Sequence, residues 1–276
     1  MRNKSPNINE LLKVMQRLRD PISGCPWDTK QTFQTIIPHT LEEAYEVIDT
    51  IERKDYHHLK EELGDLLFQV IFYSQIADEE ALFNFDAVVS LLTQKLIYRH
   101  PHVFPDGTLS SRRSESIDPA DEASVKKNWE LLKTKERSIK GRHSALSDIP
   151  NNFPSLIRAQ KLQKRAASQG FDWPSTEGVF SKINEEIKEL KSAIAKADSR
   201  GIEEELGDII FTVVNLCRHL DVDAETAARK SSYKFEKRFQ YVEDHLANCN
   251  QEISETTPKI LEDLWAKAKR KLARIK

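Results

Sequence analysis

The chain contains two groups of acidic residues, and both groups have the same spacing. Glu43 and Glu46 lie three residues apart, and they are followed by Glu62 and Asp65, which are also three apart. The same spacing recurs 143 residues later, and the surrounding sequence is similar: EELGDLLFQVIF in the first half corresponds to EELGDIIFTVVN in the second. The repeat indicates two copies of one acidic site. The second copy consists of Glu186, Glu189, Glu205 and Asp208.

The spacing of these acids suits a metal site between two helices. Residues three positions apart share a helix face, so two packed helices could aim four carboxylates into one pocket. Unaccompanied, the carboxylates would repel one another and raise each other's pKa, whereas a divalent cation removes the repulsion. An all-oxygen ligand set favours Mg²⁺ or Mn²⁺ over Zn²⁺. Because Mg²⁺ usually shares its coordination with phosphates, the pattern predicts an enzyme that acts on a phosphate ester or anhydride.

Structural explanations of the acids stay open on the sequence alone. Glutamates are common on solvated helix faces, and Thr40 with Glu43 fits a capping box, which would give Glu43 a purely structural role. Against this, Asp65 and Asp208 each begin an apolar run, where a buried carboxylate is costly without a partner. The glycine before each aspartate suggests the close approach of another group. A di-iron carboxylate bundle is disfavoured, because its Glu-x-x-His pairs do not occur here.

Basic and aromatic residues follow each acidic set in the same order. A lysine and an arginine four residues apart on one helix face could neutralise the phosphates of a nucleotide, and a tryptophan could stack on its base. A solvated basic face and a core tryptophan are the alternatives for each pair alone. The pairs are Lys95–Arg99 and Trp129–Lys133 in the first half, and Lys234–Arg238 and Trp265–Lys269 in the second.

The bulk composition fits a helical protein with two domains. The chain has 276 residues but only eight glycines, which suits long helices better than turn-rich β structure. A net charge of −2 provides no field that would attract nucleic acid or an anionic membrane. Three widely spaced cysteines suit the free thiols of a reducing cytoplasm. With neither an apolar signal segment nor an apolar run near ~20 residues, we expect a cytoplasmic protein without a membrane partner.

Apolar periodicity and helix-breaking residues predict an all-α fold of two related helical bundles. We expect the first acidic helix to begin between Pro38 and Thr40, and the apolar helix after it to lie in a core. The predicted domains are residues 1–137 and 155–276, joined by a linker at 138–154. The other expected helices are 9–19, 57–77, 86–99, 124–136, 155–168, the second acidic and apolar helices, 224–246, and one after Pro258.

The motifs together resemble the MazG family of nucleoside triphosphate pyrophosphohydrolases, in its long, tandem-domain bacterial form. The resemblance covers nearly the whole chain and is carried by GCPWDTKQTF, TLEEAYEV, EELGDLLFQV and RHPHVF. It implies an all-α fold whose bundles are completed by dimerisation, and hence a homodimer. It also implies Mg²⁺-dependent hydrolysis of nucleoside triphosphates, ATP included, to monophosphate and pyrophosphate with broad base specificity.

The resemblance also assigns roles to residues. It implies that the C-terminal domain carries most of the activity, in line with one difference between the halves: position 39, which is 143 residues before Lys182, is a histidine. In the first half the equivalent metal ligands are Glu43, Glu46, Glu62 and Asp65. In the second half the catalytic metal ligands are Glu186, Glu189, Glu205 and Asp208, and the nucleotide contacts are Lys182, Glu185, Lys234, Arg238, Trp265 and Lys269.

Within this interpretation, Glu185 is the candidate for the general base that activates water. Other functions remain open on the sequence. One is a related pyrophosphohydrolase with a narrow substrate range. Another is a nucleotide- or protein-binding helical module with little or no hydrolysis in one or both halves. The third is a helical scaffold with surface acids, which would gain no stability from Mg²⁺.

Overall fold

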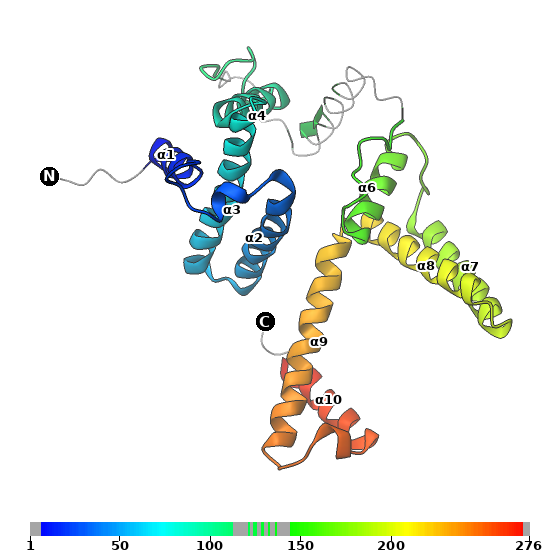
Figure 1. Cartoon of the computed structure of the whole chain (residues 1–276). Coiled ribbons are helices and arrows are strands. Elements are labelled where there is room, and N and C mark those ends of the chain that lie inside the picture. Colours follow the sequence, from blue (N-terminus) through cyan, green and yellow to red (C-terminus); the bar gives the residue numbers. More distant parts are fainter. Residues whose placement is uncertain are drawn as a thin grey trace. The chain divides into compact units, whose positions relative to one another are not determined.

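The computed structural model describes residues 7–112 and 144–272 without interruption. Every element in the described residues is a helix, and no strand occurs among them, which confirms the predicted all-α class (Figure 1). The chain divides into two compact units, residues 1–135 and 136–276. Residue 137 and the first part of the predicted linker lie outside the described residues. Between the two long stretches the structure describes only residues 121, 124, 125, 128, 129, 132 and 136.

One predicted helix, 124–136, is therefore described only in part. Its residues 124, 125, 128, 129, 132 and 136 are helical. Lys133, which the sequence pairs with Trp129, lies outside the described residues, so the proposed basic and aromatic pair of the first half has one described member.

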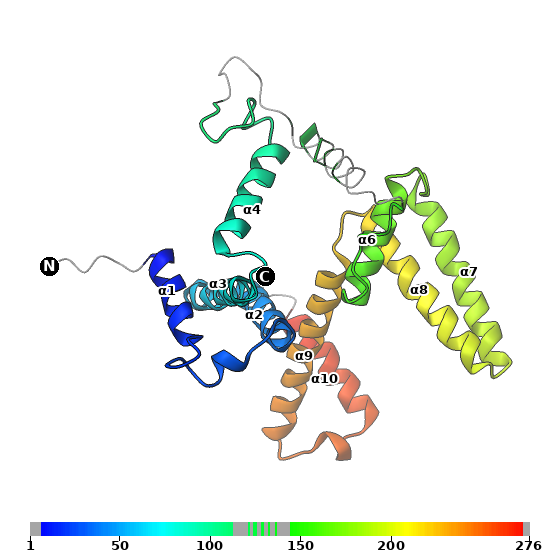
Figure 2. The ribbon, with the colours of Figure 1, turned by 45° about the horizontal axis from the view of Figure 1, so that its top comes forward.

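In the first unit, α3 is the central element. The long helices α2 and α3 form a hairpin, while α1 and α4 both pack on α3 (Figure 2). The hairpin turns at Lys54, whose φ of 59° is left-handed, and the amide of Asp55 closes the turn on the Thr50 carbonyl at 2.9 Å. The elements are α1 (Ile8–Leu18), the 3-10 helix η1 (Asp28–Lys30), α2 (Phe33–Arg53), α3 (Tyr56–Glu79) and α4 (Phe85–Arg99).

The start of α2 differs from the sequence prediction. The helix begins at Phe33 because Thr32 caps it, in a reciprocal pair of hydrogen bonds with Thr35. Pro38 lies inside the helix, where it removes only the amide that would bond to the carbonyl of residue 34. Thr40 is therefore mid-helix, and its hydroxyl donates to the Ile36 carbonyl at 3.1 Å. The predicted start at Pro38–Thr40 is wrong, and so is the capping-box role for Glu43.

The core of the first unit lies where α1, α2 and α3 meet. Phe72 is fully buried there, and the ring of Trp27 packs on it edge-on, with centroids 6.4 Å apart. The turn that carries Trp27 is held by Arg19, which pairs with Glu79 at 2.6 Å and donates to the carbonyl of Asp28. The buried cluster consists of Met15, Ile36, Ile71, Phe72 and Ile76.

The second unit repeats the hairpin of the first. Helices α7 and α8 turn back on each other at Ala197, whose φ of 52° matches that of Lys54 at the equivalent position. Helices α9 and α10 form a second pair, and Figures 1 and 2 show it leading away from the α7–α8 pair. The elements are α6 (Ser155–Ala167), α7 (Thr176–Ala195), α8 (Ser199–His219), α9 (Ala224–Ala247), the 3-10 helix η2 (Ile253–Glu255) and α10 (Pro258–Leu272).

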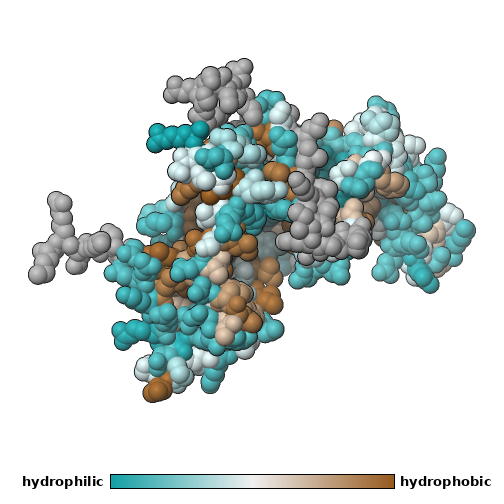
Figure 3. Space-filling model, turned by 90° about the horizontal axis from the view of Figure 1, so that it is seen from above, coloured by the Kyte–Doolittle hydropathy of each residue, from teal (hydrophilic) through white to brown (hydrophobic). Residues whose placement is uncertain are grey.

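Both hairpins leave an apolar stripe exposed, so the prediction that α3 is buried after Asp65 is only partly right. On each helix three large side chains at helical spacing lie in the open, and Figure 3 shows brown hydrophobic patches on the face that it presents. A Cβ added at Gly64 or Gly207 would meet nothing within 4 Å, so no group of the described chain makes the predicted close approach. The stripes are Leu63, Leu67 and Val70 on α3, and Leu206, Ile210 and Val213 on α8.

These stripes do not make the helices membrane-spanning. None of the helices in the described stretches is long and apolar enough to cross a bilayer.

We expect the substitution Phe72→Ala to lower the free energy of unfolding of the first unit by about 3–5 kcal/mol, because it leaves a cavity in a close-packed core. Chemical denaturation of the full chain measures this. Leu82→Ala is the control, since Leu82 is 62% exposed and its loss should change stability by less than about 0.5 kcal/mol. Equal effects of the two substitutions would contradict the core described here.

Candidate functional site

The acids of the second half converge on the α7–α8 hairpin. Glu186 comes from α7 and Glu205 and Asp208 come from α8, and one carboxylate oxygen of each lies within 4.8 Å of the others. Glu186 is buried, with 3% of its surface exposed, whereas Asp208 is exposed. The fourth acid, Glu189, is hydrogen-bonded to Glu186 through its side chain. All four acids of the repeat therefore lie together.

Charge compensation at these acids comes from Lys182, one turn before Glu186. Its ammonium donates to Glu185 and Glu186, each at 2.7 Å. These bonds lower the pKa of Glu186 below its ordinary value and raise that of Lys182. At Glu205, burial, a hydrogen bond to Glu186 and the neighbouring negative charges raise the pKa. Burial and the neighbouring carboxylates thus favour the protonated form of Glu205, whereas Lys182 favours the charged form of Glu186.

The donor set fits a hard divalent cation. All candidate ligands are carboxylate oxygens, which suit Mg²⁺ or Mn²⁺. The Oε2 atom of Glu205 is buried and has no hydrogen-bond partner among the described residues, which is costly unless another group meets it. A cation between Glu186, Glu205 and Asp208 would provide that oxygen with a partner.

The first half brings its acids together in the same way but without a lysine. Glu43, Glu62 and Asp65 offer oxygens within 4.8 Å of one another, and Glu46 is hydrogen-bonded to Glu62. Burial and then neighbouring carboxylates raise the pKa values of Glu43 and Glu62. His39 stands where the second half has Lys182, and its Nδ1 lies 3.6 Å from Glu42 rather than on this cluster. The two sites therefore differ in charge compensation.

One argument from the sequence is corrected by this geometry. Asp65 and Asp208 are both exposed in the single chain, so neither is a carboxylate buried at the start of an apolar helix. The apolar residues that follow them include the exposed stripes. The buried acid is instead Glu186, and its partner is Lys182.

The other nucleotide contacts predicted for the second half gather elsewhere, on α9 and α10. The guanidinium of Arg238 lies over the ring of Trp265 at 6.0 Å, and Lys269 and Trp265 line a pocket of about 560 Å³. Arg238 Nε is buried and has no partner among the described residues. Lys234 is exposed on the same helix as Arg238. Figure 1 shows α9 and α10, which carry these four residues, leading away from α7 and α8, which carry the acids.

Another pocket, which was not predicted from the sequence, lies between α6, α8 and the turn before α7. Its volume is about 540 Å³, and Gln163, Trp173 and Asn215 are among its lining residues. Residues 170–173, in the turn between α6 and α7, form part of its wall. One difference between the two halves indicates this pocket in the sequence. Position 215 is an asparagine, whereas the equivalent residue of the first half is Phe72.

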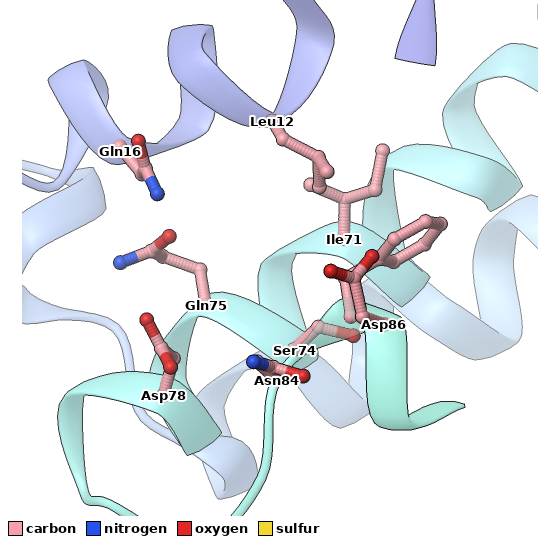
Figure 4. A pocket seen from close by; sticks show the side chains of 9 residues that line it. Leu12, Gln16, Ile71, Ser74, Gln75, Asp78, Asn84 and Asp86 are labelled. Carbon is pink, nitrogen blue, oxygen red and sulfur yellow. The ribbon is translucent and has the colours of Figure 1, made fainter. Parts of the chain in front are cut away.

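A small polar pocket in the first unit is separate from the acids. It has a volume of about 150 Å³, and Figure 4 shows Gln16 on α1 facing Gln75 and Asp78 on α3 across it. Asp78 lies 13 residues after Asp65 on the same helix, so the two are about 20 Å apart along its axis. The Asn84 side chain at its edge already caps α4 by accepting from the amide of Ala87.

Comparison with known proteins bears on both acidic hairpins. The family model described as MazG nucleotide pyrophosphohydrolase domain matches the chain twice, at residues 31–104 and 175–243. These matches contain both acidic sets and exclude the turn at residues 170–174.

Full-length relatives are similar as well. The chain is 48% identical, over 95% of its length and 97% of the relative's, to the nucleoside triphosphate pyrophosphohydrolase of Escherichia coli K12. It is 42% identical, over 95% of each chain, to the nucleoside triphosphate pyrophosphohydrolase/pyrophosphatase MazG of Thermotoga maritima. It is 36% identical to half of the uncharacterized protein YabN of Bacillus subtilis, over 93% of its own length.

Removing the lysine should change how stability depends on pH. With Lys182 present, the lowered pKa of Glu186 contributes stability above the ordinary carboxyl pKa, and this is lost as pH falls. In Lys182→Met, burial and the adjacent carboxylates should raise the pKa of Glu186 instead. Without divalent ions, the variant should therefore lose thermal stability relative to wild type as pH rises from about 5 to about 8.

Thermal unfolding followed by circular dichroism at several pH values measures this effect. Lys191→Met is the matched control, because Lys191 is exposed on the same helix. Parallel pH profiles for wild type and Lys182→Met would show that the lysine does not stabilise the charge of Glu186.

Proposed function

The chain belongs to the MazG family of nucleotide pyrophosphohydrolases, and from that premise we propose that it hydrolyses nucleoside triphosphates between the α- and β-phosphates. The products are a nucleoside monophosphate and pyrophosphate, the required cation is Mg²⁺ with Mn²⁺ as a substitute, and several bases, adenine included, are accepted. The observation that carries the proposal is the convergence of Glu186, Glu205 and Asp208 beside Lys182. Both full-length relatives carry the name of this activity.

Glu186, Glu189, Glu205 and Asp208 would hold the cation. When bound, it would offset the charge of the triphosphate and make a coordinated water more acidic than bulk water. Two helices and the turn between them hold these acids close together. The acids would therefore determine where the cation lies and, through the cation, where the phosphates lie.

Residues beside the four acids would stabilise the negative charge of the leaving group and accept the proton of the attacking water. Lys182 has an ammonium already placed beside Glu186, from which it can bond to a phosphate oxygen as negative charge develops on the leaving pyrophosphate. Glu185 is exposed and next to Lys182, and we assign it the role of accepting the proton of the attacking water.

A second copy of the chain would complete this site. The exposed stripe on α8 and the open surface at Gly207 provide an apolar face for another chain to cover. Helices α9 and α10 lead away from α7 and α8 (Figure 2), so we place the side chains that they carry at the acids of the partner in a homodimer, namely Lys234, Arg238, Trp265 and Lys269. There they would contact phosphates and nucleoside, and the buried Arg238 Nε would gain an acceptor.

The two halves would differ in catalytic activity. We assign most of the turnover to the second half, because it has Lys182 where the first half has His39. In the first half the acids could still bind a cation, since Glu43, Glu62 and Asp65 offer oxygens within 4.8 Å of one another. Binding of nucleotide without hydrolysis is therefore the second candidate function, for the first half alone.

We place this activity in the cytoplasm. The three cysteines, Cys25, Cys217 and Cys249, are all free thiols, as in a reducing compartment. The net charge of −2 fits a small anionic substrate held by local cations and a metal, without a surface for nucleic acid.

Two substitutions test the site. Glu189→Ala and Asp208→Ala should each lower kcat/KM for nucleoside triphosphates by about 100-fold or more, as expected for loss of a metal ligand. Wild-type protein incubated with Mg²⁺ and a panel of triphosphates should release monophosphate and pyrophosphate, separated by anion exchange. Glu203→Ala, an exposed acid on α8, is the control and should retain activity.

Two outcomes would contradict this assignment. Diphosphate and orthophosphate as products would mean attack at the γ-phosphorus. Full activity in both ligand variants, with helicity unchanged, would place the site elsewhere.

Complementation tests the shared site. Asp208→Ala and Arg238→Ala homodimers should each be inactive. In a dimer with a twofold axis, a random mixture of the two chains has half its dimers mixed, each with one intact site, so about a quarter of wild-type activity should return. Activity is measured after mixing and refolding, and native mass spectrometry verifies the mixed dimers. Mixed dimers without activity would mean that both residues serve the site of their own chain.

A further inference from the structure

The connection between α8 and α9 determines the direction in which the α9–α10 pair leaves the rest of its unit. This connection, the elbow, consists of residues 220–224 and ends with the first residue of α9. Helices α9 and α10 carry the side chains that we place at the partner's acids, and Figure 2 shows them leading away from α7 and α8. The angle at the elbow therefore decides where those side chains arrive.

The bonds that the elbow makes locally close each helix end separately. Asp221 is left-handed, with a φ of 54°, and the amide of Val222 donates to the Cys217 carbonyl of α8 at 2.8 Å. On the other side, the Asp223 side chain caps α9 by accepting from the amide of Thr226 at 2.8 Å. Neither bond joins one helix to the other, so neither fixes the angle between them.

A side chain from a third helix bridges the elbow. Gln160 of α6 donates from Nε2 to the carbonyl of Val222 at 2.8 Å, and its Oε1 accepts from the amide of Ala224 at 3.0 Å. The amide of Ala224 is in the first turn of α9, where backbone N–H groups have no acceptor within the helix. In the part of the chain that the structure describes, Gln160 is the one side chain of another helix that hydrogen-bonds to the elbow.

The helix that carries Gln160 is itself attached to α8. Ala159, the preceding residue, packs in one buried cluster with Val214 of α8 and Ala224 of α9. Gln163, in the next turn of α6, donates to the backbone of α8 at 2.8 Å. Helix α6 thus connects the helix that carries two of the acids with the first turn of α9.

The length of α9 makes the angle at the elbow important. Arg238 lies 14 residues after Ala224, about 21 Å along the helix axis. A rotation of about 10° at the elbow would move Arg238 by about 4 Å, whereas hydrogen-bond lengths vary over a range of only about 0.5 Å. A misplacement of about 1 Å can lower a rate about 100-fold. A small change of direction would therefore take the guanidinium out of reach of a phosphate.

The first half lacks this bridge. Its α3–α4 connection closes α3 in the same way, with left-handed Ala81 at a φ of 55° and the amide of Leu82 on the carbonyl of Ala77 at 2.8 Å. Here α1 is separated from the connection by the pocket of about 150 Å³, across which Gln16 faces Gln75 (Figure 4). Within residues 7–112, no side chain of α1 hydrogen-bonds to the start of α4. The bridge thus occurs in the half that has Lys182.

We propose that Gln160 is a positioning residue for the shared site. Its two bonds across the elbow fix the direction of α9, so that Lys234 and Arg238 meet the substrate held at the partner's acids. The inference rests on the proposed function, including the homodimer. Although α6 packs on the helix that carries acids of its own chain, Gln160 serves the site of the partner.

Substitution of Gln160 tests this role first in homodimers. Gln160→Leu removes both bonds, and water can replace them because the side chain is only partly buried, so the chain should fold. We expect kcat/KM for nucleoside triphosphates to fall by about 10–100-fold. Gln160→Glu removes only the donor and should also lower kcat/KM, which keeps the test available should Gln160→Leu fail to fold. Gln251→Leu, the same exchange at an exposed position after α9, is the matched control and should keep wild-type activity.

Mixed dimers then show which site Gln160 serves. A Gln160→Leu chain mixed with an Asp208→Ala chain pairs intact acids with an intact α9–α10 pair, so about a quarter of wild-type activity should return in a random mixture. A Gln160→Leu chain mixed with an Arg238→Ala chain has no intact α9–α10 pair. Activity should then stay at or below that of the Gln160→Leu homodimer.

The reverse pattern, with activity restored by Arg238→Ala but not by Asp208→Ala, would show that Gln160 serves the acids of its own chain and would overturn the inference. Wild-type activity in the Gln160→Leu homodimer would overturn it too. So would a lack of recovery with either partner, which would indicate a general loss of structure. Failure of Asp208→Ala and Arg238→Ala to complement each other, or an inactive wild-type protein, would instead overturn the proposed function.

Discussion

Mutual repulsion among carboxylates is the constraint on which this structure depends. Each hairpin brings four acids into a volume where they cannot all be charged and uncompensated. The second half meets the constraint in part through Lys182, which bonds to Glu186, while the pKa of Glu205 stays raised and its Oε2 atom has no partner among the described residues. A cation between the carboxylates would offset the same repulsion, so the cost of bringing the acids together and a capacity to bind metal would have the same origin.

The two halves show how one backbone can carry different sites. Their hairpins have the same turn, with left-handed Lys54 and Ala197 at equivalent positions. Two side-chain differences lie near the acids: His39 for Lys182 beside them, and Phe72 for Asn215 two turns beyond them. The first exchange removes a positive charge, and the second closes a pocket. Fold and acids were therefore retained while the surroundings that serve a substrate diverged.

Much of the architecture was predictable, because it is local. Helical periodicity predicts the helices, and the repeat predicts that the acids of each half meet. The start of α2 was missed because Pro38 was taken for a boundary, although a proline near a helix start costs only one backbone hydrogen bond. The burial of Asp65 and Asp208 was wrong because an apolar run does not tell which of its faces another chain or helix covers. The amide pocket was missed because its walls come from residues distant in sequence.

The paired stripes have a consequence for how the protein exists in the cell. A chain alone exposes the stripe of Leu63, Leu67 and Val70 and that of Leu206, Ile210 and Val213 to water. If like surfaces cover one another, part of the hydrophobic free energy is gained only on association, so the melting temperature rises with protein concentration. A newly made chain would then expose both apolar stripes until it binds a partner. Its exposure to aggregation and proteolysis would therefore depend on the concentration of the same protein already present.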